Sequence, residues 1–431
     1  MKRAKRAVTL LLFFTLLFTM AACGQKAADP VVTTTPSGSS PTTATSMPPS
    51  GEADIRLLEA EGWMNYNYGF SQMLMALSDD GIYYTNTSGF LRYFDKDTGV
   101  SFTLCQKVGC LHEEEEDRKK REECEAIIGH PAVLFFWAGN IYFDKKDLHG
   151  HGLYSREADG TAERKLAELC TAYRGEDLSY ILYNFLFAEG SLYYRVNVQK
   201  QKMADGQANT NTKDDVLLHL DLTSGKEREL FRINEEEGSF SLLAGHKDAV
   251  MIKTRAAFDI KEGGLEALYN AKSEVWLFSS RAVASKILLQ MTDRELGTVV
   301  YLSGGELYSK PKGAETGRIL NLLTGGQREH TLPGDHIYGD YYKTVTVFED
   351  GSSQWTIYNA KTGQMLENEL KDILCMAEMY ANAEGVILEL LYMDEDNGIS
   401  THSYCYIAFS NMADGLQKED FTEIISEAGR G

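Results

Sequence analysis

From Gly62 onward, the chain alternates hydrophobic and polar residues in short runs that are separated by turn residues. One phrase recurs along it: an acidic or small residue, a glycine, a hydrophobic residue and then an aromatic pair. Copies and weaker versions of this phrase start near residues 80, 138, 189, 247, 304, 339 and 384. Alternation over such short runs, bounded by turn residues, predicts β-strands rather than helices.

A second phrase follows most copies of the first one. It is an apolar run that ends in a polar turn with glycine, at residues 91–99, 153–160, 217–225 and 356–363. The pattern is typical of a strand, a hairpin turn that needs a positive φ at glycine, and a further strand. Two hairpins per unit predict a four-stranded sheet, and such small sheets must stack on one another to be stable.

The repeats predict an all-β protein, a β-propeller of seven blades, although six to eight blades fit the pattern. Seven units between about residue 53 and residue 424 give about 53 residues each, more than the ~40–45 of compact WD-type blades. A closed ring of blades also leaves few strand edges exposed. The alternative is a pair of packed β-sandwiches, but the recurrence of both phrases in the same order favours the propeller.

The first 23 residues predict where the protein is located. Four basic residues precede an apolar run at 8–20, which is too short to span a bilayer, and small residues then lead to Cys23. This segment resembles the lipobox of bacterial lipoproteins, with Met20 in place of the usual leucine. The resemblance implies a signal peptide over residues 1–22 and a lipidated Cys23 that anchors the protein outside the cytoplasm. The alternative is an ordinary secretory peptide.

Residues 23–52 are rich in threonine, serine and proline and almost free of large apolar side chains. Such a segment cannot bury enough surface to offset its ordering entropy, so it is expected to be a flexible linker. The folded domain is then residues 53–431. No later apolar run approaches spanning length, so attachment to the membrane is expected through the lipid on Cys23.

The formal net charge of −20 restricts the partners. The leader contains only basic charges, so the chain without it is more acidic still. An excess of negative charge repels phosphate backbones and anionic lipid, which argues against nucleic acid as a partner. A neutral or cationic glycan, peptide or envelope protein fits better.

The sharpest local feature is a cluster of three cysteines and one histidine. Cys105, Cys110, His112 and Cys124 offer the ligands of a tetrahedral Cys3His zinc site. A disulfide between two of these cysteines is natural outside the cell and is favoured over the metal site, and free thiols are the third possibility. In each case we expect a structural role. We expect no cofactor, with a structural zinc ion as the alternative.

Three further motifs invite a functional interpretation. His149 and His151 would share one face of a strand, but no acidic partner is visible nearby, so a hairpin tip is expected. Residues 394–398 lack the spacing of a calcium loop and predict an Asn-Gly hairpin turn. Residues 231–234 resemble the Phe/Tyr-Arg-Ile-Pro phrase of sialidases, but Asn234 stands in place of the proline and the arginine lies in mid-chain.

The blade phrases as a whole resemble the repeats of lipoproteins from Gram-positive anaerobes, which are related to propellers of the TolB and low-density-lipoprotein-receptor-like type. The resemblance covers roughly residues 79–410 and includes the segment CQKVGCLH at 105–112. It implies a propeller fold and an extracytoplasmic, lipid-anchored location. It implies no activity.

No catalytic motif stands out in the sequence, which has no nucleophile elbow, Walker loop or His-Glu-x-x-His. The sequence therefore predicts a non-enzymatic binding module for an envelope or extracellular ligand. A propeller-type hydrolase acting on glycans or peptides is the alternative, and a purely architectural role is a third hypothesis. No catalytic residue is assigned.

Overall fold

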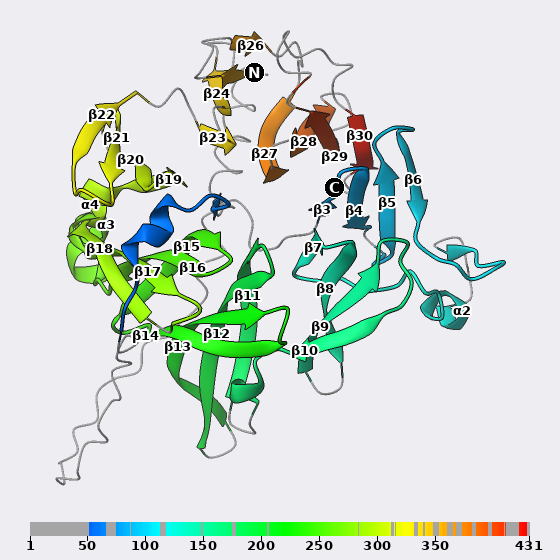
Figure 1. Cartoon of the computed structure of the whole chain (residues 1–431), viewed down its shortest axis with the longest axis horizontal. Coiled ribbons are helices and arrows are strands. Elements are labelled where there is room, and N and C mark those ends of the chain that lie inside the picture. Colours follow the sequence, from blue (N-terminus) through cyan, green and yellow to red (C-terminus); the bar gives the residue numbers. More distant parts are fainter. Residues whose placement is uncertain are drawn as a thin grey trace, which may run out of the picture. The chain divides into compact units, whose positions relative to one another are not determined.

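Strands joined by short turns make up most of the described chain (Figure 1). The computed structural model describes residues 51–65, 75–86, 88–112, 118–147, 150–174, 178–204, 207–282, 284–311, 314, 316–331, 335–338, 341–347, 353–359, 365–367, 373–381, 385–394, 399–408, 410 and 422–428. These residues all belong to the unit Ser46–Gly431. Cys23, the leader, His149 and residues 395–398 lie outside the described residues.

The described strands form seven sheets, and we number them 1 to 7 in chain order. Each contains four consecutive antiparallel strands, and the fourth sheet gains one further short strand at either edge. Sheet 1 is β3–β6 (Met75–Leu77, Gly81–Thr85, Leu91–Asp95, Val100–Thr103), and sheet 2 is β7–β10 (Leu134–Trp137, Asn140–Asp147, Gly150–Glu157, Arg164–Glu168). Sheet 3 is β11–β14 (Leu178–Ala188, Ser191–Ala204, Gln207–Asp221, Lys226–Asn234), and sheet 4 contains β15–β18 (Gly238–His246, Ala249–Ala256, Lys272–Ser279, Ala284–Thr292).

The remaining three sheets come from the C-terminal part of the chain. Sheet 5 is β19–β22 (Thr298–Ser303, Glu306–Lys310, Gly317–Asn321, Gln327–His330). Sheet 6 is β23–β26 (Asp335–Tyr338, Tyr341–Val347, Ser353–Asn359, Met365–Glu367), and sheet 7 is β27–β30 (Ile373–Ala381, Gly385–Asp394, Ile399–Ala408, Thr422–Ala428). The helices α2 (Arg118–Glu122), α3 (Ile260–Asn270) and α4 (Asp293–Leu296) are short. In the part of the chain that the structure describes, no helix has the length and apolarity needed to cross a membrane.

The two sequence phrases occupy fixed places in these sheets. The first phrase leads into the second strand of every sheet, and the second phrase covers a third strand and the turn after it. In sheet 1 the Asp95 carboxylate accepts hydrogen bonds from the backbone N–H groups of Asp97 (3.0 Å) and Thr98 (2.8 Å). Gly99 then closes the turn with a φ of 67°. The aspartate and the glycine therefore specify the hairpin locally.

Neighbouring sheets pack face to face through the side chains on both of their faces. Between sheets 2 and 3 the rings of Phe135 and Phe187 stack at 4.3 Å. Between sheets 5 and 6 the hydroxyls of Tyr301 and Tyr342 lie 2.7 Å apart. First strands also contact one another between sheets 1 and 2 and between successive sheets from 3 to 7, and the first strand of sheet 7 contacts that of sheet 1.

Apolar packing of the last sheet on the first one closes the ring. Met75, Ile82 and Phe94 of sheet 1 share one buried cluster with Ile387 and Ile424 of sheet 7. No strand is shared between these two sheets among the described residues. The predicted all-β propeller is thereby confirmed, and its seven sheets fall within the predicted range of six to eight blades.

The segment before sheet 1 is bound to sheet 4, far from it in sequence. Strand β1 (Gly51–Glu52) pairs in parallel with β18, and β2 (Met64–Asn65) pairs with β15 at the opposite edge. Between them the 3-10 helix η1 (Ile55–Glu59) places Leu58, with no exposed surface, in the cluster between sheets 4 and 5. We call residues 51–65 the N-terminal clasp.

The clasp also bridges two sheets through one side chain. The Asn65 amide donates to the carbonyl of Leu302 at 3.1 Å, and its oxygen accepts the Leu302 N–H at 2.6 Å. An asparagine amide offers both a donor and an acceptor, so here it takes the place of a backbone partner for β19. The clasp therefore stabilises the contact between sheets 4 and 5.

We expect Leu58→Ala to lower the free energy of unfolding by about 2–5 kcal/mol, because it leaves a cavity in a fully buried cluster. Leu265, which is 60% exposed, provides the control: Leu265→Ala should change it by less than about 0.5 kcal/mol. Urea unfolding of both variants measures the difference. Equal small losses would show that the clasp is not part of the core.

Candidate metal centre

The structure brings Cys105, Cys110, His112 and Cys124 together beside sheet 1. One ligand atom from each residue lies within 4.8 Å of the ligand atoms of the other three. The Cys124 sulfur and the His112 Nδ1 are 3.6 Å apart. Cys124 is buried and the other three residues are half-buried. The four side chains thus form one cluster, although they come from separate stretches of the connection between sheets 1 and 2.

Backbone hydrogen bonds fix the base of this connection to sheet 1. Leu104 donates its N–H to the carbonyl of Leu91 (3.0 Å), and Leu91 in turn donates to Ala126 (2.8 Å). Phe90 is fully buried, belongs to the same apolar cluster as the three cysteines and forms an isolated β-bridge with Ile127. The chain therefore leaves and rejoins sheet 1 at neighbouring points, which brings Cys124 back to Cys105.

Tight turns present the ligands. Cys110 donates its N–H to the carbonyl of Lys107 at 3.2 Å, and Gly109 between them has a φ of 74°. His112 has a φ of 53°, a left-handed conformation that histidine adopts more readily than most residues other than glycine. Just after α2, Cys124 donates its N–H to the carbonyl of Arg121. Cys110 and Cys124 thus stand beside tight turns, and none of the four ligands lies within a strand.

The thiols differ in their electrostatic surroundings. Burial raises the pKa of Cys105, but hydrogen bonds from the backbone N–H groups of Lys107 and Glu125 and from neighbouring thiols bring it below its ordinary value. Burial raises the pKa of Cys124 to about 12, and the neighbouring thiols add to this rise. In the protein without metal, Cys105 therefore loses its proton at a lower pH than Cys124 does.

The geometry fits a tetrahedral ion. With Zn–S near 2.3 Å and Zn–N near 2.0–2.1 Å, the S···N edge of a tetrahedron is about 3.6 Å. The Cys124–His112 separation has this length. All the cysteines whose side chains the structure describes are free thiols, including Cys170 and Cys405, which are buried elsewhere. The four residues present therefore fit a zinc ion, and three thiolates would give it a soft ligand set.

Another histidine has a partner that the sequence did not reveal. His151 Nδ1 lies 3.4 Å from Asp144 Oδ2, across the hairpin of β8 and β9. The expectation that His151 has no acidic partner is therefore wrong. The two residues are only seven apart, but the diagonal contact depends on the register of the hairpin, in which His151 stands opposite Lys146.

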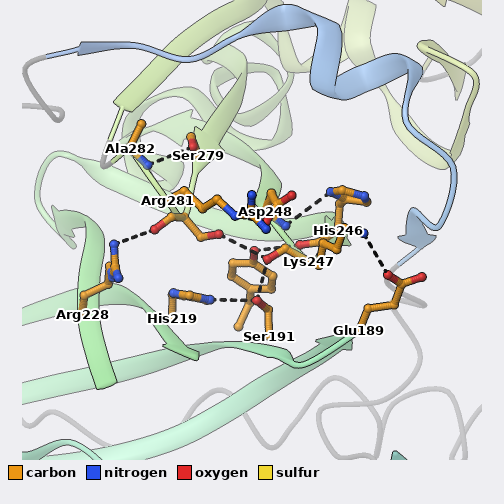
Figure 2. A network of polar contacts seen from close by, with 12 residues as sticks. Glu189, Ser191, His219, Arg228, His246, Lys247, Asp248, Ser279, Arg281 and Ala282 are labelled. Carbon is orange, nitrogen blue, oxygen red and sulfur yellow. Dashed lines mark hydrogen bonds and ion pairs between the residues drawn. The ribbon is translucent and has the colours of Figure 1, made fainter. Parts of the chain in front are cut away.

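A polar network joins sheets 3 and 4 (Figure 2). The Ser191 hydroxyl donates to the carbonyl of Lys247 at 2.6 Å, and His219 Nε2 lies 2.9 Å from the same hydroxyl oxygen. Tyr193 donates to the carbonyl of His246, and Arg228 donates to that of Ser280. These bonds satisfy turn carbonyls of sheet 4 with side chains of sheet 3.

The Ser191–His219 pair is not arranged as nucleophile and base. The serine gives its only proton to a carbonyl, so His219 must donate from Nε2, and its Nδ1 is buried without a hydrogen-bond partner. Both side chains are buried. A catalytic base would instead accept the serine proton at an accessible site. The pair is therefore structural.

Burial lowers the pKa of His219 to about 4, and the positive charge of Arg228 adds to the effect. The unfolded chain binds this proton near pH 6.5, so folding is favoured above that pH, and stability falls as the pH decreases from 6.5 towards 4. Between about pH 7.5 and about pH 5, we expect the wild type to lose about 2 kcal/mol more stability than His219→Gln. Urea unfolding at both pH values measures this, and equal losses would contradict it.

The other predicted motifs have local explanations. Arg232, from the sialidase-like phrase, forms ion pairs with Asp214 (2.9 Å) and Glu229 (2.7 Å) on the surface of sheet 3. The strands on either side of the predicted Asn-Gly turn pair with each other, β28 with β29, and Asp394 stands opposite Ile399. The turn itself lies outside the described residues.

No protein-family model and no curated protein sequence matches this chain. Solved structures similar to it include the acylaminoacyl peptidase of Pyrococcus horikoshii, with a TM-score of 0.47 and 9% identity over 84% of this chain and 54% of that one. Prolyl oligopeptidase B of Galerina marginata has a TM-score of 0.45 and 9% identity, over 88% and 53%. TolB of Acinetobacter baumannii has a TM-score of 0.31 and 10% identity, over 78% and 75%. These similarities are too distant to carry any function across to this chain.

Proposed function

We propose that this protein is an extracytoplasmic binding module. It is a β-propeller that is anchored to the membrane by a lipid on Cys23 and contains one structural zinc ion held by Cys105, Cys110, His112 and Cys124. The convergence of these four ligand atoms within 4.8 Å supports the zinc ion in this proposal. Four protein ligands fill a tetrahedral ion and leave no position for substrate, which favours a structural role over a catalytic one.

The position of the centre supports the same role. The connection between sheets 1 and 2 contains the acidic run 113–117 and the charged helix α2, which offer little apolar surface to bury. A metal ion replaces the missing core there, because binding to a folded site adds directly to stability. The zinc thus holds a long insertion in place at the edge of the propeller.

The polar groups of the network in Figure 2 do not form a nucleophile and base for covalent catalysis. Ser191 donates its proton to the Lys247 carbonyl beside sheet 4, and His219 contacts the Ser191 oxygen within sheet 3. An accessible nucleophile with a free base would favour the hydrolase alternative instead.

Native mass spectrometry of residues 24–431, produced without lipid, tests the metal centre. We expect one zinc ion per chain in the wild type and in Cys405→Ser, whose buried cysteine lies outside the cluster. Cys124→Ser should retain less than one tenth of the zinc under the same conditions, because it removes one of the four ligands. A chain without metal that is two hydrogens short would instead establish a disulfide and overturn the zinc assignment.

Removal of the predicted anchor tests the location. In bacteria fed an alkyne-labelled fatty acid, the full chain should be labelled and found with the membranes, because two or more acyl chains hold a protein firmly. Cys23→Ser should lose the label and leave the membrane fraction, whereas Cys405→Ser should keep both. A Cys23→Ser protein that stays with the membranes would contradict the proposed anchor.

A further inference from the structure

A cavity of about 420 Å³ opens beside the metal centre. Its walls are Glu122 of α2, residues 127–130 of the returning connection, and Asp144, Lys145, Lys146 and His151 of the hairpin β8–β9. This volume falls within the range of small-molecule sites, ~300–1,000 Å³. The segment that carries Cys124 thus also builds one wall of the cavity.

One polar group in the cavity is held in a fixed orientation. Asp144 is 4% exposed, and its Oδ1 accepts the backbone N–H groups of Ala132 (2.6 Å) and Val133 (2.9 Å). Its Oδ2 is thereby turned towards His151 Nδ1, while the ring of Tyr180 meets the imidazole edge-on at 6.1 Å. The carboxylate selects the tautomer with the proton on Nδ1, so His151 Nε2 remains for another partner.

A hydroxyl group is the partner that suits this nitrogen best. Neutral His151 accepts a hydrogen bond at Nε2, and protonated His151 donates one. A hydroxyl can form a hydrogen bond with either protonation state of His151, because it is both a donor and an acceptor. A carboxylate only accepts, so it could bind only the protonated state, and an ammonium only donates, so it could bind only the neutral state.

The other walls favour a neutral ligand as well. Lys145 already pairs with Glu163 at 3.2 Å, and the lining also includes Lys146 and Glu122, which carry opposite charges. The lining therefore offers donors and acceptors of both signs, with no net charge to select an ion. Ile127 and Ile128 provide an apolar wall beside these polar groups.

We infer that this cavity binds a sugar residue of a neutral glycan, with a ring hydroxyl on His151 Nε2 and the carbon face of the ring against Ile127. Hydroxyls on both sides and an apolar C–H face are the chemistry of a pyranose, and they match the mixed lining. Asp144 acts here as a positioning residue for His151. The inference rests on the proposed binding function and adds to it the class of ligand.

Saturation-transfer NMR on the zinc-loaded chain 24–431 tests the inference with three probes: maltose, glucuronate and glycylglycine. We expect transfer to maltose alone among these probes. In His151→Leu the dissociation constant for maltose should rise about tenfold, as expected for one lost hydrogen bond. His330→Leu removes a histidine of sheet 5 that does not line the cavity, so it should bind maltose like the wild type.

Several outcomes would overturn the inference: no transfer to maltose, equal transfer in wild type and His151→Leu, or preference for the charged probes. Cleavage of maltose to glucose would refute the non-enzymatic function but leave sugar binding at this cavity standing. The zinc content of the same sample, measured by mass spectrometry, reports separately on the metal centre.

The role of Asp144 is tested by the nitrogen-15 spectrum of the histidine rings at a pH where His151 is neutral. The wild type should show the Nδ1–H tautomer of His151, and Asp144→Asn should shift it towards Nε2–H, because the amide can donate to Nδ1. The same tautomer in both proteins would contradict the positioning role.

Discussion

Sheets 1 to 4 each contribute side chains to two buried apolar clusters, one on either face, and the rest of the structure depends on covering those faces. A four-stranded sheet alone cannot bury them, so each sheet needs a neighbour on either side. The ring must then close, which it does through the packing of Met75 and Phe94 of sheet 1 against Ile387 of sheet 7. The clasp adds to this at the contact between sheets 4 and 5, where Leu58 and Asn65 join the two sheets.

The candidate metal centre and the cavity lie in a region that has little apolar packing. The connection between sheets 1 and 2 is highly charged, and the cluster around Phe90 is small. A zinc ion bound by Cys105 and Cys124 would join the two ends of this connection. The same segment then supplies Ile127 and His130 to the cavity, so the proposed metal and the proposed ligand site depend on one piece of backbone.

The sequence predicted the features that are encoded locally. Seven copies of one phrase marked the second strands of seven sheets, because the turn before each strand and the alternation within it are properties of a few adjacent residues. In the same way, Asp95 and Gly99 specify their hairpin through bonds within five residues. The cysteine and histidine cluster was visible because metal ligands belong to few residue types.

What the sequence could not predict depends on contacts across distance or on register. The clasp pairs Gly51 with Ala284, and no local pattern indicates that partner. The contact between Asp144 and His151 requires the register of one hairpin. The hydrogen bond that takes the Ser191 proton requires a carbonyl beside the next sheet. A residue type alone therefore could not distinguish a structural histidine such as His219 from one that opens onto a cavity.

X-ray absorption at the zinc edge of the purified chain tests the proposed metal centre most directly. We expect three sulfur neighbours at about 2.3 Å and one nitrogen at about 2.0–2.1 Å, with one zinc ion per protein. A first shell of nitrogen and oxygen only would contradict it, because the zinc would then be bound away from Cys105, Cys110 and Cys124.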